Sequence, residues 1–275
     1  MADPLAFYAA PSPMTAAGRH DALVAALPAD PADLARVVPG LLLHEFWPKA
    51  YGMAAEDLRA DGGPLADARP VRLRVVGVCR HFALLLTAML RAKGAPARAR
   101  CGFADYFNPG WFEDHWVCER WSAAEGRWLL TDAQLDQTQR AALRIDFDPL
   151  DVLRGRFLVA GDAWALCRSG GADPARFGIF RGDLRGLWFI AGDLLRDLAA
   201  LNGVETLAWD VWGAMPSPDA TVPPSELALF DRIAALSRAP DAAFDELRAL
   251  YLGDARLRVP RVVLNAVLNR MESVP

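Results

Sequence analysis

The sequence has few of the residues that crosslink small proteins or ligate zinc. Only four cysteines and four histidines occur among 275 residues, and no two cysteines form a Cys-x-x-Cys pair. Closely spaced ligands are the mark of zinc motifs, and dense cysteines are the mark of disulfide scaffolds. We therefore expect free thiols, no metal and no cofactor. The wholly apolar runs extend over a few residues, against roughly 20 for a membrane-spanning helix, so no membrane contact is expected.

The charge balance disfavours another class of partner. Thirty basic residues face 34 acidic ones, for a net charge of −4 and a pI near 5.6. Such a surface is a poor match for a phosphate backbone, so we expect no nucleic-acid partner. The first residues, MADPLAFY, lack the basic and apolar regions of a signal peptide, which favours a cytoplasmic location. At 53% apolar residues the chain has enough hydrophobic material for a large core.

The pattern along the chain predicts one domain, 1–275, in three parts. Residues 1–70 are expected to form helices, with Asp30 as an N-cap before Pro31 and a turn-rich stretch at 61–70. Residues 71–140 hold a helix and three strands. Residues 141–275 are expected to add a helical C-terminal part. The helices expected in the first and third parts cover 15–27, 31–47, 149–157, 184–201, 224–237, 241–251 and 261–272.

The middle part has the clearest periodicity. Apolar residues at 82, 85, 86, 89 and 90 follow the i, i+3, i+4 spacing of one helix face. This helix is expected to begin near Cys79 and to end at Lys93-Gly94, a basic last turn followed by a C′ glycine. Three strands are expected after it, over 97–104, 115–121 and 127–132.

The last two strands predict a hairpin. If Ser122–Glu125 form its loop, Trp121 pairs with Gly126, and the same register places His115 directly opposite Asp132. Cross-strand partners point to the same face. An aspartate in that position would hold the imidazole in one tautomer.

Cys79 is the candidate nucleophile. A cysteine at a helix N-terminus lies against unpaired backbone N–H groups and the positive end of the helix dipole, and both favour the thiolate. Gly77, two residues earlier, leaves room for a substrate. Alone, a cysteine here is more often a small core residue, as we expect for Cys101 and Cys118. The His115–Asp132 hairpin is what favours a Cys–His–Asp site.

Three segments resemble one known family. Residues 77–98 read GVCRHFALLLTAMLRAKGAPAR, residues 115–121 read HWVCERW and residues 128–132 read WLLTD. Together they resemble the core motif of the transglutaminase-like superfamily, over about a quarter of the chain. The resemblance implies an α+β fold with a papain-like core, in which a small antiparallel sheet packs on the nucleophile helix and further helices come from both ends of the chain. It further implies Cys79 as nucleophile, His115 as general base and acid, and Asp132 as the orienting carboxylate.

The chain departs from that family in two respects. Many relatives have proline directly after the aspartate, where this sequence has Ala133. The flanking regions also lack the calcium-loop spacing expected of the multidomain animal crosslinking enzymes. We therefore expect a bacterial, single-domain type with its own helical elaboration.

Other residues are candidates for supporting roles. Trp47, His81, Trp111 and Trp116 are candidate substrate-binding residues. Trp47 or His44 is a candidate second oxyanion donor beside the Cys79 N–H. His81 is also expected to cap the Cys79 helix. Glu119 is expected in a buried salt bridge. For Trp47, His44 and His81 a packing or structural role is the commoner alternative.

Three classes of function remain open at this level. The first is cysteine-dependent acyl transfer through a thioester, as hydrolysis or transamidation of an amide in a small molecule or peptide. A coenzyme-A-thioester-dependent N-acyltransferase would use the same three residues. The second class is a non-catalytic binding module that kept the fold, and the third is a helical interaction protein based on residues 147–275.

Overall fold

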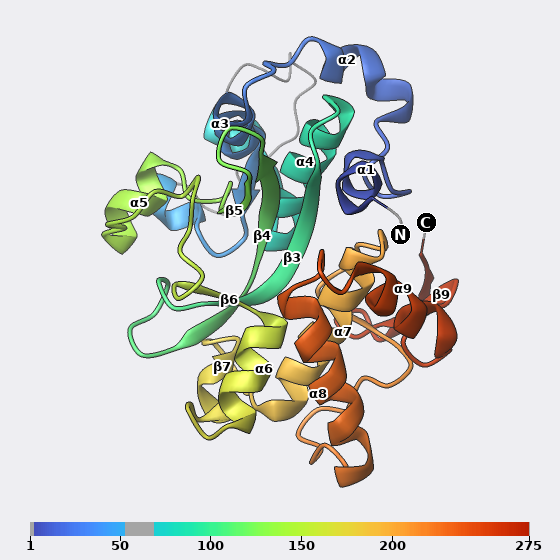
Figure 1. The fold of residues 1–275 in the computed structure, drawn as a ribbon. Helices are drawn as coiled ribbons and strands as arrows, with labels where there is room; N and C mark the ends of the chain where they lie inside the picture. The colour runs from blue at the N-terminus through green and yellow to red at the C-terminus, as the bar shows by residue number, and fades with distance from the viewer. Residues whose placement is uncertain (1–2, 53–68, 275) are drawn as a thin grey trace. The chain divides into compact units, whose positions relative to one another are not determined.

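Helices and strands alternate through the chain in the computed structural model, which describes residues 3–52 and 69–274 (Figure 1). The α-helices are α1 Pro4–Ala9, α2 Asp21–Ala25, α3 Pro31–Leu41, α4 Cys79–Ala92, α5 Gln137–Leu143, α6 Ala160–Arg168, α7 Leu187–Leu201, α8 Pro224–Arg238 and α9 Phe244–Gly253. The strands are β1 Leu42–His44, β2 Val75–Gly77, β3 Ala97–Ala104, β4 Phe112–Ser122, β5 Arg127–Thr131, β6 Phe157–Val159, β7 Phe177–Gly178, β8 Asp210–Val211, β9 Val262–Asn265 and β10 Arg270–Ser273. Short 3-10 helices are η1 Gly18–His20, η2 Pro48–Tyr51, η4 Val71–Leu73 and η5 Pro174–Arg176.

A five-stranded sheet carries the fold. Its strand order is β5-β4-β3-β6, and β7 also pairs with β4. The β4–β5 and β3–β6 pairs are antiparallel, whereas β7 runs parallel to β4. All eight residues of β3 are buried, which fits a strand covered on both faces. The expected α+β architecture with a small antiparallel sheet is confirmed.

Packing divides the chain into two compact units. The first, here called the core unit, contains residues 5–99 and 116–153. The second, here called the helical unit, contains residues 1–4, 100–115 and 154–275. Strands β3 and β4 each begin in one unit and end in the other.

The core unit is built on α4. The apolar face of this helix packs with α3 in one hydrophobic cluster that includes Leu34, Val38, Phe82 and Leu86, each at most 1% exposed. Polar contacts join α4 to the sheet. Thr87 Oγ1 donates to Cys118 Sγ on β4 at 3.3 Å, and Arg91 Nε donates to the Ala97 carbonyl on β3 at 2.8 Å. The sheet therefore packs on the Cys79 helix, as expected.

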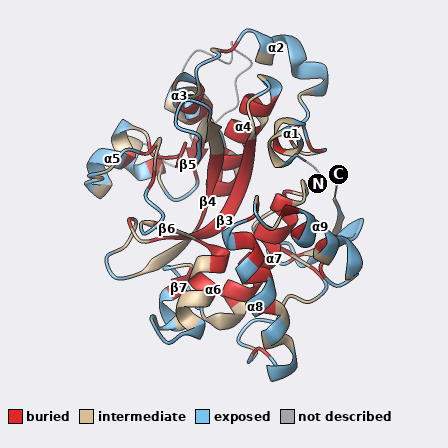
Figure 2. Cartoon of the chain, viewed as in Figure 1, coloured by how far each residue is buried: buried red, intermediate tan, exposed pale blue. Residues whose placement is uncertain are grey.

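The helical unit is built around α7. Thirteen of its fifteen residues are buried, so this helix is covered on all sides, as a central helix must be. Helices α6 and α8 pack against it and against each other, and Figure 2 shows the burial along α7. The fully buried Arg100 on β3 pairs with Asp197 on α7, with a 2.9 Å bond from Nε to Oδ1.

Several predicted elements have the expected bounds, and four differ. In place of the helix predicted over 15–27, the structure has η1 Gly18–His20 and the short α2 Asp21–Ala25. Strand 97–104 and the helix from Cys79 are confirmed, and α8 begins at Pro224 as expected. The helix predicted over 31–47 ends at Leu41, where β1 begins. Residues 149–157 form no helix, and 261–272 form the β9–β10 hairpin instead of a helix. Of the turn-rich stretch 61–70, residues 61–68 lie outside the described residues.

Within the described parts of the chain, no helix is both long and apolar enough to cross a lipid bilayer.

Candidate active site

Cys79 is the first residue of α4 and is 7% exposed. The chain enters the helix in an extended conformation at Val78, whose backbone N–H donates to His81 Nδ1 at 3.1 Å. The first turn of α4 contains no acidic residue. Its backbone N–H groups and dipole therefore act on the Cys79 sulfur without an opposing carboxylate from the helix itself.

A two-stranded parallel pair brings His44 next to the start of this helix. β1 pairs with β2 so that His44 lies beside Gly77, two residues before Cys79. His44 is 7% exposed, and its Nδ1 accepts the Phe46 backbone N–H at 3.3 Å. A neutral imidazole that accepts at Nδ1 carries its proton on Nε2 and can donate there. The pair replaces the end of the predicted helix 31–47, and the sequence pattern did not indicate it.

The hairpin register differs from the predicted one. Trp121 pairs with Trp128 rather than with Gly126, and Ser122 pairs with Arg127. The loop is therefore shifted by one residue, because Gly126 takes a positive φ of 64° inside the turn. Thr131 faces Cys118, so the predicted direct pairing of His115 with Asp132 is wrong.

The β4–β5 pairs end at Thr131, so Asp132 lies one residue beyond the paired part of β5. Continuing the register places position 132 beside Val117 instead of His115, which is a displacement of two residues along β4. Side chains alternate with a period of two, so residues 115 and 117 lie on the same face of that strand.

His115 lies in an aromatic environment on β4. It is 1% exposed, and its ring contacts Phe107 at 4.8 Å, Tyr106 at 6.0 Å and Phe157 at 6.2 Å between centroids. Phe107 and Tyr106 come from the loop before β4, which sequence analysis did not link to the imidazole. These rings restrict the orientation of His115 by packing.

Asp132 directly follows β5 and is 3% exposed. Its backbone N–H donates to the Pro149 carbonyl at 2.8 Å. Its Oδ1 accepts the backbone N–H of Gln134 at 3.0 Å, which fixes the carboxylate in a short turn. The side chain is thus anchored by groups within the core unit.

The four candidate substrate-binding residues occupy different environments. Trp47 is half-buried at the start of η2, and Trp111 donates from Nε1 to the Gly178 carbonyl at 3.1 Å. Trp116 is 1% exposed, which favours a packing role over substrate contact. His81 caps α4 as expected, and burial, followed by the charge of Arg80, lowers its pKa.

Glu119 forms the predicted buried salt bridge. Its Oε2 accepts from Arg98 Nε at 2.6 Å, with both side chains at most 8% exposed. The Arg98 guanidinium also lies 3.9 Å from the Trp128 ring centroid and 4.7 Å from that of Tyr8. This pair joins β3 to β4 inside the core unit.

The remaining cysteines have environments that suppress the thiolate. Burial raises the pKa of Cys118 to about 11, and the hydrogen bond from Thr87 offsets this only in part. Burial, and then the charge of Asp173, raises the pKa of Cys167 to about 12. Burial also raises the pKa of Cys101 well above its usual range.

Comparison with known proteins identifies one family. A model described as the transglutaminase-like superfamily matches residues 56–133. A solved structure from Cytophaga hutchinsonii, described as "a Putative Cysteine Protease", is similar at 21% identity with a TM-score of 0.30. That similarity covers 49% of this chain and 43% of the other, so the chain spans less than half the length of that protein. A search of curated proteins gives no match.

The family match includes Cys79, His115 and Asp132, the three residues that the motif pattern singled out. The part of the chain that matches the transglutaminase-like superfamily is thus residues 56–133.

Proposed function

We propose that this chain is a cysteine-dependent enzyme that transfers acyl groups through a thioester on Cys79. One observation carries the proposal: Cys79 is the first residue of α4 and lies in the segment that matches the superfamily. A thiolate at that position is stabilised by the N–H groups and dipole of the helix. The other three cysteines have raised pKa values and are poor nucleophiles at neutral pH.

The proposed reaction has two steps. The Cys79 thiolate attacks the substrate carbonyl, the carbon–nitrogen bond of an amide breaks, and protonated His115 gives its proton to the departing amine. This leaves an acyl group on sulfur. Water or a second amine then attacks the thioester, neutral His115 takes the proton of the attacking group, and the carbon–sulfur bond breaks to restore the thiolate.

Two further roles complete the proposed site. Asp132 would orient the His115 imidazole and stabilise its charged form, as an anchored carboxylate does in such triads. The Cys79 backbone N–H would donate to the oxyanion. The second donor is proposed to be His44 rather than Trp47, because β1 places His44 beside Gly77.

The proposed substrate is an amide in a small molecule or peptide, and the acceptor is water or an amine. A coenzyme-A thioester as acyl donor is the alternative within this chemistry. It would use the same nucleophile and differ in the leaving group, a thiolate in place of an amine. A binding module that retained the fold is the alternative outside it.

An acyl-enzyme trap tests the proposal. The full chain is mixed with p-nitrophenyl acetate, and the intact mass and the modified peptide are measured. We expect one acetyl group on Cys79, its release by neutral hydroxylamine as a thioester requires, and no adduct in Cys79→Ala. Cys167→Ala, which removes a half-buried cysteine elsewhere, serves as the matched control and should acylate like the wild type.

The outcomes separate the alternatives. Acylation that is slowed at least a hundredfold in His115→Ala supports general acid–base catalysis. Turnover with acyl-coenzyme A donors alone would select the N-acyltransferase. No adduct on Cys79, or equal adducts on Cys79 and Cys167, would refute the enzyme proposal and leave the binding module.

A further inference from the structure

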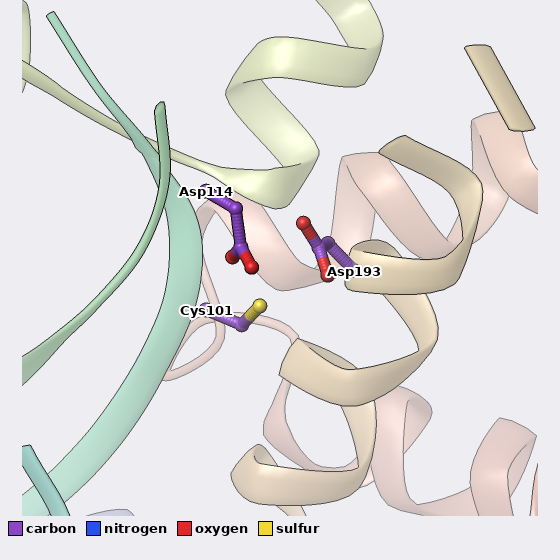
Figure 3. Close-up of side chains that lie close together, drawn as sticks. All are labelled: Cys101, Asp114 and Asp193. Atoms are coloured by element: carbon purple, nitrogen blue, oxygen red, sulfur yellow. The ribbon is translucent and has the colours of Figure 1, made fainter. Parts of the chain in front are cut away.

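Three side chains with metal-binding atoms converge inside the helical unit. Cys101 comes from β3, Asp114 from β4 and Asp193 from α7. Their sulfur and carboxylate atoms lie within 4.8 Å of one another. Figure 3 shows the two carboxylates and the sulfur pointing toward a common centre. Cys101 is fully buried, Asp193 is 1% exposed, and Asp114 is partly buried.

Two oxygens of this cluster have no N–H or O–H donor among the described residues, and the Cys101 thiol is the one cluster group that acts on Asp193 as a donor. The two oxygens are Asp114 Oδ1 and Asp193 Oδ2, and both are inaccessible to solvent. A buried carboxylate oxygen without a donor loses its hydration and gains nothing in return, so nearly all such groups in proteins have a partner. Here two of them belong to one cluster. That coincidence indicates a missing positive group between them.

The charges around the cluster indicate how much positive charge the missing group must carry. Two carboxylates and a thiolate carry three negative charges. Arg196 supplies one positive charge, through a 3.0 Å bond from Nη1 to Asp193 Oδ1. A divalent cation at the centre makes the sum zero. A monovalent cation leaves a buried negative charge, which a protein interior tolerates poorly.

Burial makes the ionised forms of these three groups costly when no cation is near. Burial, and then the nearby Asp193 carboxylate, raises the pKa of Asp114 and of Cys101 well above the usual ranges. Burial raises the pKa of Asp193 to about 6, although Arg196 acts against it. A bound cation would compensate the ionised forms.

We propose that Cys101, Asp114 and Asp193 bind one divalent transition-metal ion of the zinc class. A thiolate donor selects zinc-like ions over calcium and magnesium, which prefer oxygen ligands. Three protein ligands leave the fourth tetrahedral position to a water or another small ligand. The ion would tie α7 to β3 and β4. Its ligands lie far apart in the sequence, which is why no cysteine or histidine spacing predicted it.

Cobalt titration of the full chain tests this site independently of any enzyme activity. The protein is freed of metal with a chelator and titrated with Co²⁺, in a Cys79→Ala background so that the candidate nucleophile cannot contribute a thiolate. We expect one equivalent to produce a thiolate-to-cobalt charge-transfer band in the near ultraviolet. Zn²⁺ should displace the cobalt and abolish the band.

Two variants locate the ion. Cys101→Ser should lose the charge-transfer band, whereas Cys118→Ser, another fully buried cysteine, should keep it. Asp114→Asn should weaken cobalt binding at least tenfold while the protein stays folded by circular dichroism, because Asp114 is only partly buried. This second variant keeps the test decisive where the cysteine variant does not fold.

Three results would overturn the proposal. The first is the absence of a charge-transfer band at millimolar Co²⁺. The second is a band that survives in Cys101→Ser. The third is stabilisation of the metal-free protein by Asp114→Asn with no metal bound to any variant, which would mean that the two carboxyl groups share a proton instead.

Discussion

The selectivity of alkylation among the four cysteines follows from their environments. Iodoacetamide reacts with the thiolate, so the labelling rate at each cysteine is proportional to its thiolate fraction. With the pKa of Cys118 raised to about 11 and that of Cys167 to about 12, their thiolate fractions at pH 7 are about 10⁻⁴ and about 10⁻⁵. An ordinary thiol, with a pKa of about 8.5, has a fraction of about 3%.

The helix start should raise that fraction at Cys79. A helix dipole stabilises a charge at its N-terminus by about 1 kcal/mol, which lowers a labelling midpoint by about 0.7 pH unit. Relative to an ordinary thiol, a stabilisation of that size raises the thiolate fraction at pH 7 about fivefold. Cys79 should therefore react about a thousandfold faster than Cys118. A paired imidazolium from His115 would lower the midpoint further.

Peptide-resolved mass spectrometry across pH 5 to 10 measures these rates for all four cysteines in one sample. His115→Ala should raise the Cys79 midpoint to the value that the dipole alone gives. Cys167, the half-buried cysteine, is the internal control for access. A Cys79 midpoint at or above 8.5 would refute the reasoning, because the burial of this residue would then outweigh its helix. So would equal labelling of Cys79 and Cys167 at pH 7.

Two further predictions concern the surroundings of the site. Burial lowers the pKa of His81, so the stability from its neutral form is complete above about pH 6.5 and is lost as pH falls through the folded-state pKa. His81→Asn keeps an acceptor for the Val78 N–H and should remove this pH dependence from the free energy of unfolding measured in urea. A free energy of unfolding that changes with pH in this variant as it does in the wild type would contradict the prediction. Glu119→Gln leaves the buried Arg98 without its carboxylate and should destabilise the protein by about 3–5 kcal/mol. The control Asp151→Asn removes an exposed partner of Arg127 and should leave the melting temperature almost unchanged. Similar losses of stability in the two variants would mean that burial does not strengthen the Arg98–Glu119 pair.

The sequence predicted the elements whose form is decided locally. The apolar spacing of α4 and the glycine after its last turn were sufficient to place that helix, and β3 has the predicted bounds. The C-terminal segment shows the opposite case. Val263, Val267 and Met271 are spaced by four residues, as on one helix face, yet Asn269 adopts a positive φ of 47° and β9 pairs with β8 and β10. The pairing of β9 with β8 involves residues that are distant in the sequence, and local periodicity contains no signal for it.

The register error has a related cause. One residue in the turn, Gly126, decides whether Trp121 faces residue 126 or residue 128, and the sequence allows both loops. Similarly, the helix predicted over 149–157 is absent from the structure. The Leu150 carbonyl instead accepts from Thr131 Oγ1 at 2.9 Å, and the Val152 N–H donates to the Leu130 carbonyl at 2.8 Å. These bonds to β5 hold the segment against the sheet in an irregular chain of turns.

The two candidate sites differ in predictability for the same physical reason. Cys79 and Asp132 lie at the ends of elements, the start of α4 and the residue after β5, and such ends are marked by local turn and capping chemistry. Cys101, Asp114 and Asp193 lie on three elements that meet only through tertiary packing of α7. Each of them, taken alone, is an ordinary core or strand residue. Their chemistry exists only because the fold places two orphaned carboxylate oxygens and a thiol around one point, and only a structure reveals such a site.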